Sequence, residues 1–260
     1  MNTNSKNAIL ETRDLVKEFK GFVAVNGVSL VVRRGEVHAL IGPNGAGKTT
    51  VFNLLTKFLR PSSGSIVYNG VDITDDDPAT TARRGLVRSF QISSTFPHMT
   101  VLENVRVALQ RKLGNSFHFW RSERCLAELD PRARDLLASV ELEQYAQLKA
   151  VELPYGRKRA LELATTLALE PELMLLDEPT QGMGHEDVSR VTALIKKVSA
   201  NRTVLMVEHN MSVVASIADT ISVLQRGVVI AEGPYTEVSN DPQVIEAYMG
   251  SAATGLGGAH

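Results

Sequence analysis

The segment GPNGAGKTT, residues 42–50, constrains the fold of this chain more than any other part of its sequence. It matches the pattern G-x-x-x-x-G-K-[ST], in which glycines let backbone N–H groups curve around phosphate oxygens. The apolar segment at 36–42 predicts a buried strand before it, and residues 51–59 predict a helix after it. A strand, a glycine-rich loop and a helix in this order form a phosphate-binding unit, because the helix N-terminus faces the bound anion.

The residues of this loop predict how a nucleoside triphosphate is held. Lys48 can reach the β- and γ-phosphates, which makes it a catalytic candidate, and the Thr49 hydroxyl can bind Mg²⁺. The alternative is a tight glycine turn that binds no ligand. The predicted binding loop comprises Gly42, Pro43, Asn44, Gly45, Ala46, Gly47, Lys48, Thr49 and Thr50.

The second half of the chain alternates between short apolar strands and helices. Strands are predicted at 172–179, 203–210 and 220–227, and helices at 185–199 and 211–218. Strands that alternate with helices are typical of an α/β fold with a parallel sheet.

Two other regions differ from this pattern. Segments 10–19, 25–32 and 61–74 have strand character, and the last contains a turn signal at Asn69-Gly70, so they predict an antiparallel β layer beside the main sheet. Between about 97 and 160 the apolar residues have helical spacing. We therefore predict one domain over 1–250, with a parallel-sheet core at about 1–92 and 161–250, a helical subdomain at about 93–160, and a flexible tail at 251–260.

Composition limits the classes of function that the chain can have. Of 260 residues, 43% are apolar and 22% are charged, which fits a globular domain with a sizeable core. The formal net charge of −1 gives no overall field that would attract nucleic acid, and a single cysteine, Cys125, excludes an internal disulfide. No apolar run approaches the roughly 18–20 residues of a membrane span, and the N-terminus does not resemble a signal peptide. We therefore expect any membrane role to act through a partner.

Two adjacent carboxylates, Asp177 and Glu178, end the strand predicted at 172–179. Open α/β sheets bind their ligands at this end of the strands. Because side chains alternate along a strand, the two carboxylates have different roles. We predict that Asp177 supports Mg²⁺ and that Glu178 is catalytic, orienting or activating the attacking water. The alternative is a surface turn ended by Pro179.

Two more polar residues are candidates for the same site. His209 closes the next strand, and neighbouring parallel strands end at the same edge, so it can approach the γ-phosphate as a further catalytic residue. Gln91 lies between the β layer and the helical block, where its amide could bind Mg²⁺ or the water. A lone histidine is more often structural than catalytic, and a lone glutamine is a weak signal, so both predictions depend on position.

The stretch LPYGRKRALELA, residues 153–164, predicts a helix with an unusual first turn. Arg157, Lys158 and Arg159 crowd the end of the helix where the helix dipole is already positive. Exposed helix N-termini bind anions, so this helix start is a candidate anion-binding element. The alternative is a solvated basic surface.

Taken together, these motifs resemble the nucleotide-binding subunit of an ABC transporter. The ordered set spans about residues 19 to 210 and consists of Phe19, GPNGAGKTT, Gln91, LPYGR, LLDEP, QGMG and His209. The resemblance implies the ABC ATPase fold, ATP hydrolysis, and ATP and Mg²⁺ as ligands. It also implies that Gln91 is the Q-loop, that His209 is the switch histidine and that QGMG is the D-loop, which crosses to a partner. Phe19 would stack on adenine, with an ordinary core aromatic as the alternative.

In this family, the segment at the place of LPYGR is the signature motif, commonly LSGGQ, which binds the ATP of the other subunit. The resemblance therefore implies that Pro154, Tyr155, Gly156 and Arg157 contact a nucleotide across a head-to-tail dimer. Pro154 departs from the motif because proline has neither a hydroxyl nor an N–H for the γ-phosphate. Arg157 replaces glutamine, and QGMG lacks the usual D-loop aspartate. The second subunit is expected to be another copy of this chain or a paralogue with a cleaner signature.

Within the ABC family, the chain resembles the subfamily that takes up branched-chain amino acids. The resemblance lies in segments 17–30, 96–105 and 244–250 and in the insertion of the helical block that contains Phe117, Phe119 and Trp120. The resemblance implies a bacterial importer with a second ATPase subunit, two transmembrane permease subunits and an extracytoplasmic binding protein. The subunit would lie at the cytoplasmic face of the inner membrane, where a coupling helix of the permease would dock on the helical block near Gln91. The aromatic residues of the insertion are a candidate contact for that helix, with local core packing as the alternative.

The transported solute stays open at the level of sequence. The resemblance is compatible with hydrophobic amino acids, amides or urea. Two other functions also stay open: an ABC ATPase that acts without a membrane partner, and a regulatory subunit that binds ATP with low turnover.

Overall fold

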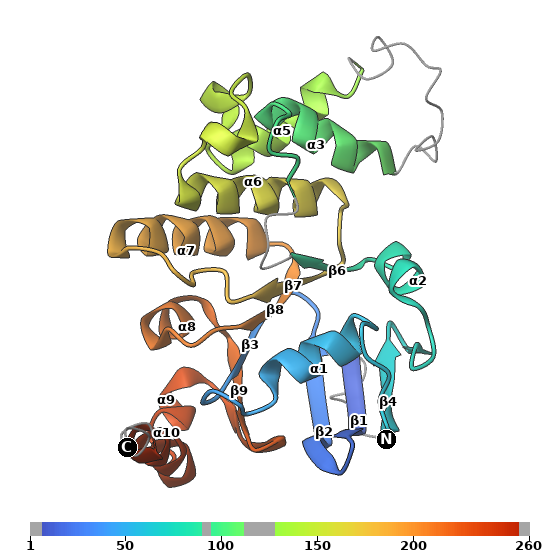
Figure 1. Ribbon diagram of the computed structural model, residues 1–260, viewed down its shortest axis with the longest axis vertical. Helices are drawn as coiled ribbons and strands as arrows, with labels where there is room; N and C mark the ends of the chain where they lie inside the picture. The colour runs from blue at the N-terminus through green and yellow to red at the C-terminus, as the bar shows by residue number, and fades with distance from the viewer. Residues whose placement is uncertain (1–6, 90–94, 112–127, 255–260) are drawn as a thin grey trace.

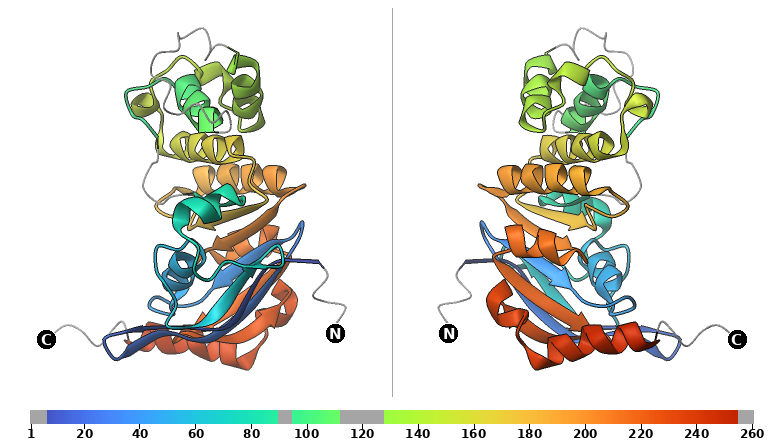
Figure 2. Two further views of the ribbon diagram at one scale, coloured as in Figure 1. Left: turned by 90° about the vertical axis from the view of Figure 1, so that its right-hand side faces the viewer. Right: turned by 90° about the vertical axis from the view of Figure 1, so that its left-hand side faces the viewer.

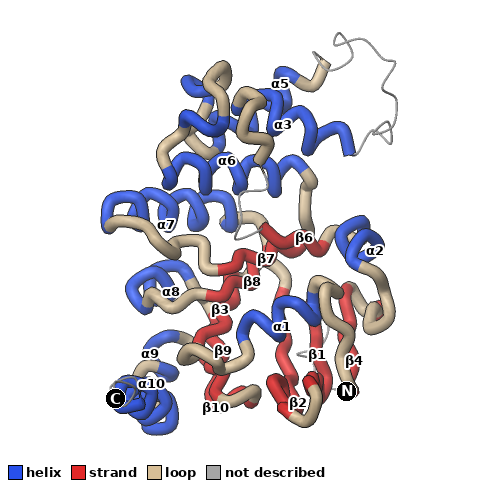
Figure 3. The backbone as a smooth tube through the Cα atoms, in the orientation of Figure 1, coloured by secondary structure: helices blue, strands red, loops and turns tan. Residues whose placement is uncertain are grey.

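The computed structural model describes residues 7–89, 95–111 and 128–254. In Figure 1 a helical region lies at the top, a mostly parallel sheet runs from the middle to the lower part, and an antiparallel sheet lies beside it at the lower right, near the N-terminus. Figure 3 shows that the strands of both sheets lie together in the part of the molecule below the helical region. This arrangement agrees with the three regions predicted from the sequence.

The larger sheet contains six strands, namely β3 (Val37–Ile41), β6 (Leu86–Ser89), β7 (Leu173–Asp177), β8 (Thr203–Val207), β9 (Thr220–Gln225) and β10 (Val228–Gly233). Their order is β10-β9-β3-β8-β7-β6. All neighbours are parallel except β10, which pairs antiparallel with β9. The parallel sheet is thus confirmed, and the structure adds its two edge strands, β6 and β10, which the sequence pattern did not single out.

The smaller sheet is antiparallel, with the order β2-β1-β4-β5. Its turn between β4 and β5 contains Asn69 at φ 51° and Gly70 at φ 75°, the pair of positive φ angles that the turn signal predicted. The strands are β1 (Ala8–Phe19), β2 (Phe22–Arg33), β4 (Ser63–Tyr68) and β5 (Val71–Asp72). The predicted antiparallel layer is therefore confirmed.

The helices cover the central sheet and form the helical region (Figures 1 and 2). Those associated with the sheets are α1 (Lys48–Leu55), α2 (Pro78–Arg83), α7 (His185–Ser199), α8 (Met211–Ile217), α9 (Tyr235–Val238) and α10 (Pro242–Thr254). The helical region contains α3 (Val101–Gln110), α5 (Asp130–Ser139), α6 (Tyr155–Ala168) and the short 3-10 helices η3 (Glu143–Tyr145) and η4 (Ala150–Glu152). The predicted boundary near residue 160 falls inside α6. Among the residues that the structure describes, no helix has the length and apolar character that crossing a membrane requires.

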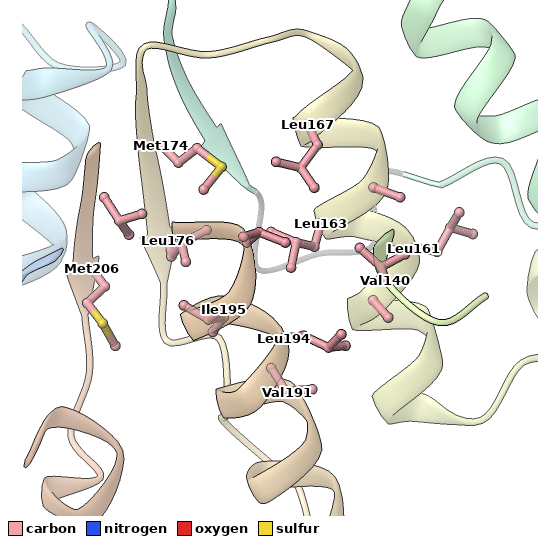
Figure 4. Close-up of a cluster of buried hydrophobic side chains, with 14 of the residues drawn as sticks. Val140, Leu161, Leu163, Leu167, Met174, Leu176, Val191, Leu194, Ile195 and Met206 are labelled. Carbon is pink, nitrogen blue, oxygen red and sulfur yellow. The ribbon is translucent and has the colours of Figure 1, made fainter. Parts of the chain in front are cut away.

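Alternation along the central strands divides the buried side chains between two hydrophobic clusters. On β7, Met174 and Leu176 belong to the cluster beneath the helical region, whereas Leu173 and Leu175 belong to the cluster facing α1 and the antiparallel sheet. Figure 4 shows Met174 and Leu176 pointing toward α6 and α7. Such strands are buried on both faces, which explains their continuous apolar sequences. The buried central strands therefore form a rigid base that fixes the positions of the polar residues at their carboxyl ends.

Lys57, which follows α1, is a charged residue among buried residues that are mostly apolar. Its ammonium is buried and has no hydrogen-bond partner within the described part of the chain. Burial lowers the pKa of Lys57 to about 8, although the carboxylates of Asp76, Asp72 and Asp75 favour the charged form. The ordinary pKa is 10.5, so between about pH 8 and pH 10.5 the unfolded chain binds a proton that the folded chain does not. The contribution of Lys57 to stability therefore rises with pH through this window.

We predict that Lys57→Met raises the free energy of unfolding at pH 7 by roughly 1–3 kcal/mol, because methionine fills a similar volume without a charge. Thermal unfolding at pH 7 and pH 10 measures this effect, and the gain should shrink at the higher pH. Lys20→Met is the matched control, because Lys20 also has a positive φ, of 48°, but is exposed. A melting temperature at pH 7 that did not rise in Lys57→Met would contradict the prediction.

Candidate functional site

The predicted phosphate loop connects β3 to α1 and is braced by two other segments. The Gly227 N–H, between β9 and β10, donates to the Ala46 carbonyl at 2.9 Å. Gly47 has φ 103°, and a Cβ there would lie 2.6 Å from the Ala24 carbonyl oxygen of β2. Glycine is therefore required at position 47 both by the backbone conformation and by the close approach of β2. The loop is held from both sheets.

Lys48 is the first residue of α1 and is buried against the loop. Its Nζ donates to the carbonyl oxygens of Gly42 at 2.6 Å and Pro43 at 3.0 Å. Burial lowers the pKa of Lys48, and the nearby charges of Glu178 and Asp177 oppose this shift. The amine is thus bonded to the loop and lies within electrostatic reach of the two predicted carboxylates.

The rest of the loop has the accessibility that a phosphate site requires. Asn44, Gly45 and Thr49 are exposed, and Pro43 and Thr50 are partly exposed. Thr49 lies in the first turn of α1, where backbone N–H groups have no acceptors within the helix. A threonine hydroxyl beside free N–H groups fits a phosphate with an associated cation.

The acidic pair lies at the carboxyl end of β7, as predicted. Asp177 is the last residue of the strand and is buried. Glu178 follows with φ 46°, an uncommon conformation for a residue other than glycine. Its N–H donates to the Val207 carbonyl of β8 at 2.9 Å, which holds this turn against the neighbouring strand. The chain therefore leaves the strand direction at Glu178, directly after Asp177.

Arg88 on β6 is a partner of Asp177 that the sequence analysis missed. Its Nη2 donates to Asp177 Oδ2, and its Nη1 donates to Asn53 Oδ1 of α1 at 2.7 Å. Arg88 thus connects the strand before Gln91, the acidic pair and the helix of the phosphate loop. Position 88 is 89 residues from Asp177 in the sequence, so no local pattern indicates the pair.

His209 lies just beyond the end of β8, the strand between β3 and β7. About half of its side chain is exposed. The residue before it, Glu208, is fully buried and accepts hydrogen bonds from the His209 N–H and from Thr180. Because β3, β8 and β7 are parallel neighbours, the phosphate loop, His209 and the acidic pair follow strand ends on the same edge of the sheet. Figure 1 shows these three strands side by side. Glu208 was missed by the sequence analysis, although a charged residue directly after the apolar run was a usable signal.

Phe19 ends β1 at the tip of the β1–β2 hairpin, where it pairs with Phe22. Its side chain is 41% exposed, and the Lys17 Nζ lies 5.1 Å from the ring centroid. The ring is therefore not a core aromatic, and an exposed ring face fits the predicted stacking role.

The LPYGR segment forms the start of α6, with Pro154 as the N-cap residue. A Cβ at Gly156 would lie 2.6 Å from Asp187 Oδ1, so glycine lets α6 approach α7 closely. The Arg157 guanidinium lies 4.0 Å from the ring centroid of Tyr145 in its own helical region. Pro154 and Tyr155 are exposed, which leaves this end of the helix accessible to another molecule.

Tyr155 links the predicted signature segment to the predicted D-loop. Its hydroxyl donates to the Gln181 carbonyl at 3.2 Å and accepts from Arg159 Nη2 at 3.1 Å. Arg159 Nη1 in turn donates to Glu162 Oε2 at 2.7 Å. The hydroxyl of Tyr155 is thus used within the subunit, and Arg159 is a structural residue rather than part of a solvated basic surface.

Two groups of predicted residues lie outside the described part of the chain. One is Gln91, with its predicted role in binding Mg²⁺ and nucleotide. The other contains the aromatic residues of the insertion, Phe117, Phe119 and Trp120.

Comparisons of the sequence with known families agree with this arrangement. A family model described as ABC transporter matches residues 25–181 of the chain, and one described as branched-chain amino acid ATP-binding cassette transporter matches residues 228–254. The chain is 41% identical over 254 residues to the high-affinity branched-chain amino acid transport ATP-binding protein BraF of Pseudomonas aeruginosa, an alignment that covers 94% of this chain and 98% of that protein.

Solved structures give the same result. The crystal structure of the ADP conformation of MJ1267, an ATP-binding cassette of an ABC transporter, matches with a TM-score of 0.83 and 32% identity, covering 94% of this chain and 99% of that one. The dimeric post-hydrolysis structure of the cassette MJ0796, bound to ADP and Pi, matches with a TM-score of 0.73 and 25% identity, covering 87% and 98%. The predicted family and fold are confirmed. The chain therefore belongs to the ABC transporter family, as an ATP-hydrolysing cassette of its branched-chain amino acid subfamily.

Proposed function

We propose that this chain is the ATPase subunit of an importer for branched-chain amino acids or related small solutes. One observation carries the proposal: Lys48, the pair Asp177-Glu178 and His209 meet at one edge of the central sheet. Similarity to BraF, whose name states branched-chain amino acid transport, supports this class of solute.

The residues of this edge fit a nucleotide with Mg²⁺. Magnesium sites in such proteins use one or two protein ligands together with substrate phosphates, so a large carboxylate cluster is not needed. In our proposal Thr49, Asp177 and Gln91 would hold the ion, and its positive charge would help to neutralise the phosphates. Phe19 stacks on adenine at the other end of the nucleotide.

The proposed chemistry is in-line attack of water on the γ-phosphate. Lys48 and the N–H groups of the loop stabilise negative charge on the phosphate oxygens. Glu178 accepts a proton from the attacking water or orients it, and His209 contacts the γ-phosphate. The turn held by the bond from the Glu178 N–H to Val207 keeps that carboxylate in place.

The signature segment supplies the other half of the proposed site, in trans. The helix start, where Pro154 and Tyr155 are exposed and Gly156 is buried beside them, faces the nucleotide of a second subunit, which is another copy or a paralogue. A dimeric cassette with 25% identity has been solved, which supports this arrangement. Pro154 offers no hydroxyl, and the Tyr155 hydroxyl already donates to Gln181, so the N–H of Gly156 and the helix N-terminus remain as the groups for the anion.

A groove between the helical region and the central sheet supports the proposed permease contact. It has a volume of about 350 Å³ and is lined mainly by apolar atoms of α2, β6, α3, α6 and the segment before α3, including Val87, Ala108 and, from that segment, Phe96. Asn104 fixes its rim by accepting from the Phe96 N–H at 2.7 Å. We propose that a helix of each of two transmembrane permease subunits docks in such a groove. The ATPase is then peripheral at the cytoplasmic face of the membrane, with an extracytoplasmic binding protein on the other side.

Solute uptake by a strain lacking this chain tests the proposal. Deletion should abolish high-affinity uptake of labelled leucine, isoleucine or valine, and the wild-type chain should restore it. Lys48→Met should not restore uptake, because the ammonium for the phosphates is missing. Loss of amide or urea uptake instead would change the solute, and unchanged uptake of every tested solute would favour an ABC ATPase without a membrane partner.

A further inference from the structure

Glu208 is a buried carboxylate at the active edge that accepts four hydrogen bonds. It is fully inaccessible to solvent and follows the last residue of β8. Oε1 accepts from the Thr180 N–H at 3.2 Å and from the Thr180 hydroxyl. Oε2 accepts from the N–H groups of His209 at 2.7 Å and Asn210 at 3.0 Å. Each oxygen therefore serves one of two separate turns.

These two turns carry the groups proposed to act on the γ-phosphate. Thr180 lies two residues after Glu178, and His209 follows Glu208 directly. The strands beneath them are paired in parallel, with Asp177 opposite Val207. The hydrogen bond from the Glu178 N–H to the Val207 carbonyl joins β7 to β8 at the carboxyl ends of the two strands. The Glu208 carboxylate connects the two turns that follow these strands. The carboxylate thus fixes the position of one turn relative to the other.

The chemistry of this position requires a carboxylate. An ionised carboxylate is a pure acceptor, so it can serve four donors without placing any donor against them. Glutamine has the same shape, but its amide NH₂ would face two of the four donors. A buried donor without an acceptor is costly, so the turn on that side would move. The side chain acts by placing other residues, since it is enclosed and does not reach the surface of the site.

We propose that Glu208 is a positioning residue for ATP hydrolysis, holding the turns of Glu178 and His209 in register. This inference rests on the proposed roles of those two residues. The ATP-binding loop lies after a different strand, β3, and is braced by Ala24 and Gly227 rather than by Glu208. A change at Glu208 should therefore affect turnover and leave nucleotide binding almost intact.

Steady-state ATPase kinetics of the full chain test this inference. Glu208→Gln should lower kcat by about ten- to a hundredfold, while KM for ATP stays within about twofold. This loss of rate is the range expected when catalytic groups are displaced by a fraction of an ångström to one ångström. Thr180→Val, which removes one donor, should lower kcat by a smaller factor. Thr180→Ser keeps the hydroxyl and should restore most of the lost rate.

Glu232→Gln is the matched control. The Glu232 carboxylate on β10 accepts a hydrogen bond from the Ser222 hydroxyl on β9 at 2.7 Å. Because Glu232 lies outside the proposed site, the kcat of Glu232→Gln should equal that of the wild type. If Glu208→Gln does not fold, as judged by circular dichroism, the Thr180 pair decides the question. An unchanged kcat in the folded variants, or a rise in KM without a fall in kcat, would overturn the inference. A wild-type chain that hydrolysed no ATP would instead contradict the proposed function itself.

Discussion

Glu178→Gln should lower the rate of ATP hydrolysis by about 10²- to 10⁴-fold, the usual contribution of a positioned general base. Glutamine preserves the size of the side chain and can still bind water, but it cannot accept the proton. The backbone at this position has φ 46°, and its N–H is bonded to Val207, so the substitution leaves the turn in place. Phosphate release from Mg-ATP by the purified variant measures the rate.

The same variant tests the proposed dimer. Because ATP is bound but not consumed, a complex of two subunits should accumulate with Mg-ATP and be detected by light scattering after gel filtration. Glu186→Gln is the control, because Glu186 is an exposed carboxylate on α7 that pairs only with Arg190 in the described bonds. An absence of ATP-dependent dimer in Glu178→Gln would count against nucleotide binding by the signature segment in trans. A wild-type rate as low as that of the variant would favour the low-turnover regulatory subunit.

Much of the fold followed from local patterns. The alternation of apolar strands with helices predicted the parallel sheet, and the Asn69-Gly70 signal predicted a turn that the structure contains. The edge strands β6 and β10 were not predicted. Only two of the four residues of β6, Leu86 and Val87, are buried, and β10 has no fully buried residue, so their sequences lack the continuous apolar run of a central strand.

The motifs placed the phosphate loop, the acidic pair and His209 at or just after the ends of strands, and the structure has them there. What they could not predict are the partners of these residues. The pairing of Arg88 with Asp177 and of Tyr155 with Gln181 depends on which strands and helices become neighbours, over separations of 89 and 26 residues. Proline at 154 and arginine at 157 were recognised as departures from the signature motif. Only the structure places the guanidinium of Arg157 on Tyr145 of the same subunit.

Gly42→Ala should disrupt both folding and nucleotide binding. A Cβ at this position would lie 2.0 Å from the carbonyl oxygen of Leu224 on β9, far inside contact distance, and Gly42 has φ 148°. The neighbouring residues Ile41 and Val223 are paired in the sheet, so the clash is relieved only by separating β3 from β9. Overpacking and backbone strain together should lower the free energy of unfolding by roughly 2–5 kcal/mol.

The Gly42 carbonyl accepts a hydrogen bond from the Lys48 ammonium, so moving this backbone also moves Lys48. We therefore expect any folded Gly42→Ala protein to bind ATP at least about tenfold more weakly, a loss of about 1.4 kcal/mol. Gly70→Ala is the matched control, because Gly70 has φ 75° and a Cβ there would meet no atom within 4 Å. That control carries only the cost of a left-handed alanine, about 1–2 kcal/mol, and should bind ATP normally. Chemical denaturation and nucleotide titration of the two variants separate these effects. If Gly42→Ala and Gly70→Ala had equal free energies of unfolding, β3 and β9 could separate at Gly42 without an energetic cost. The sheet would then not hold the phosphate loop in place.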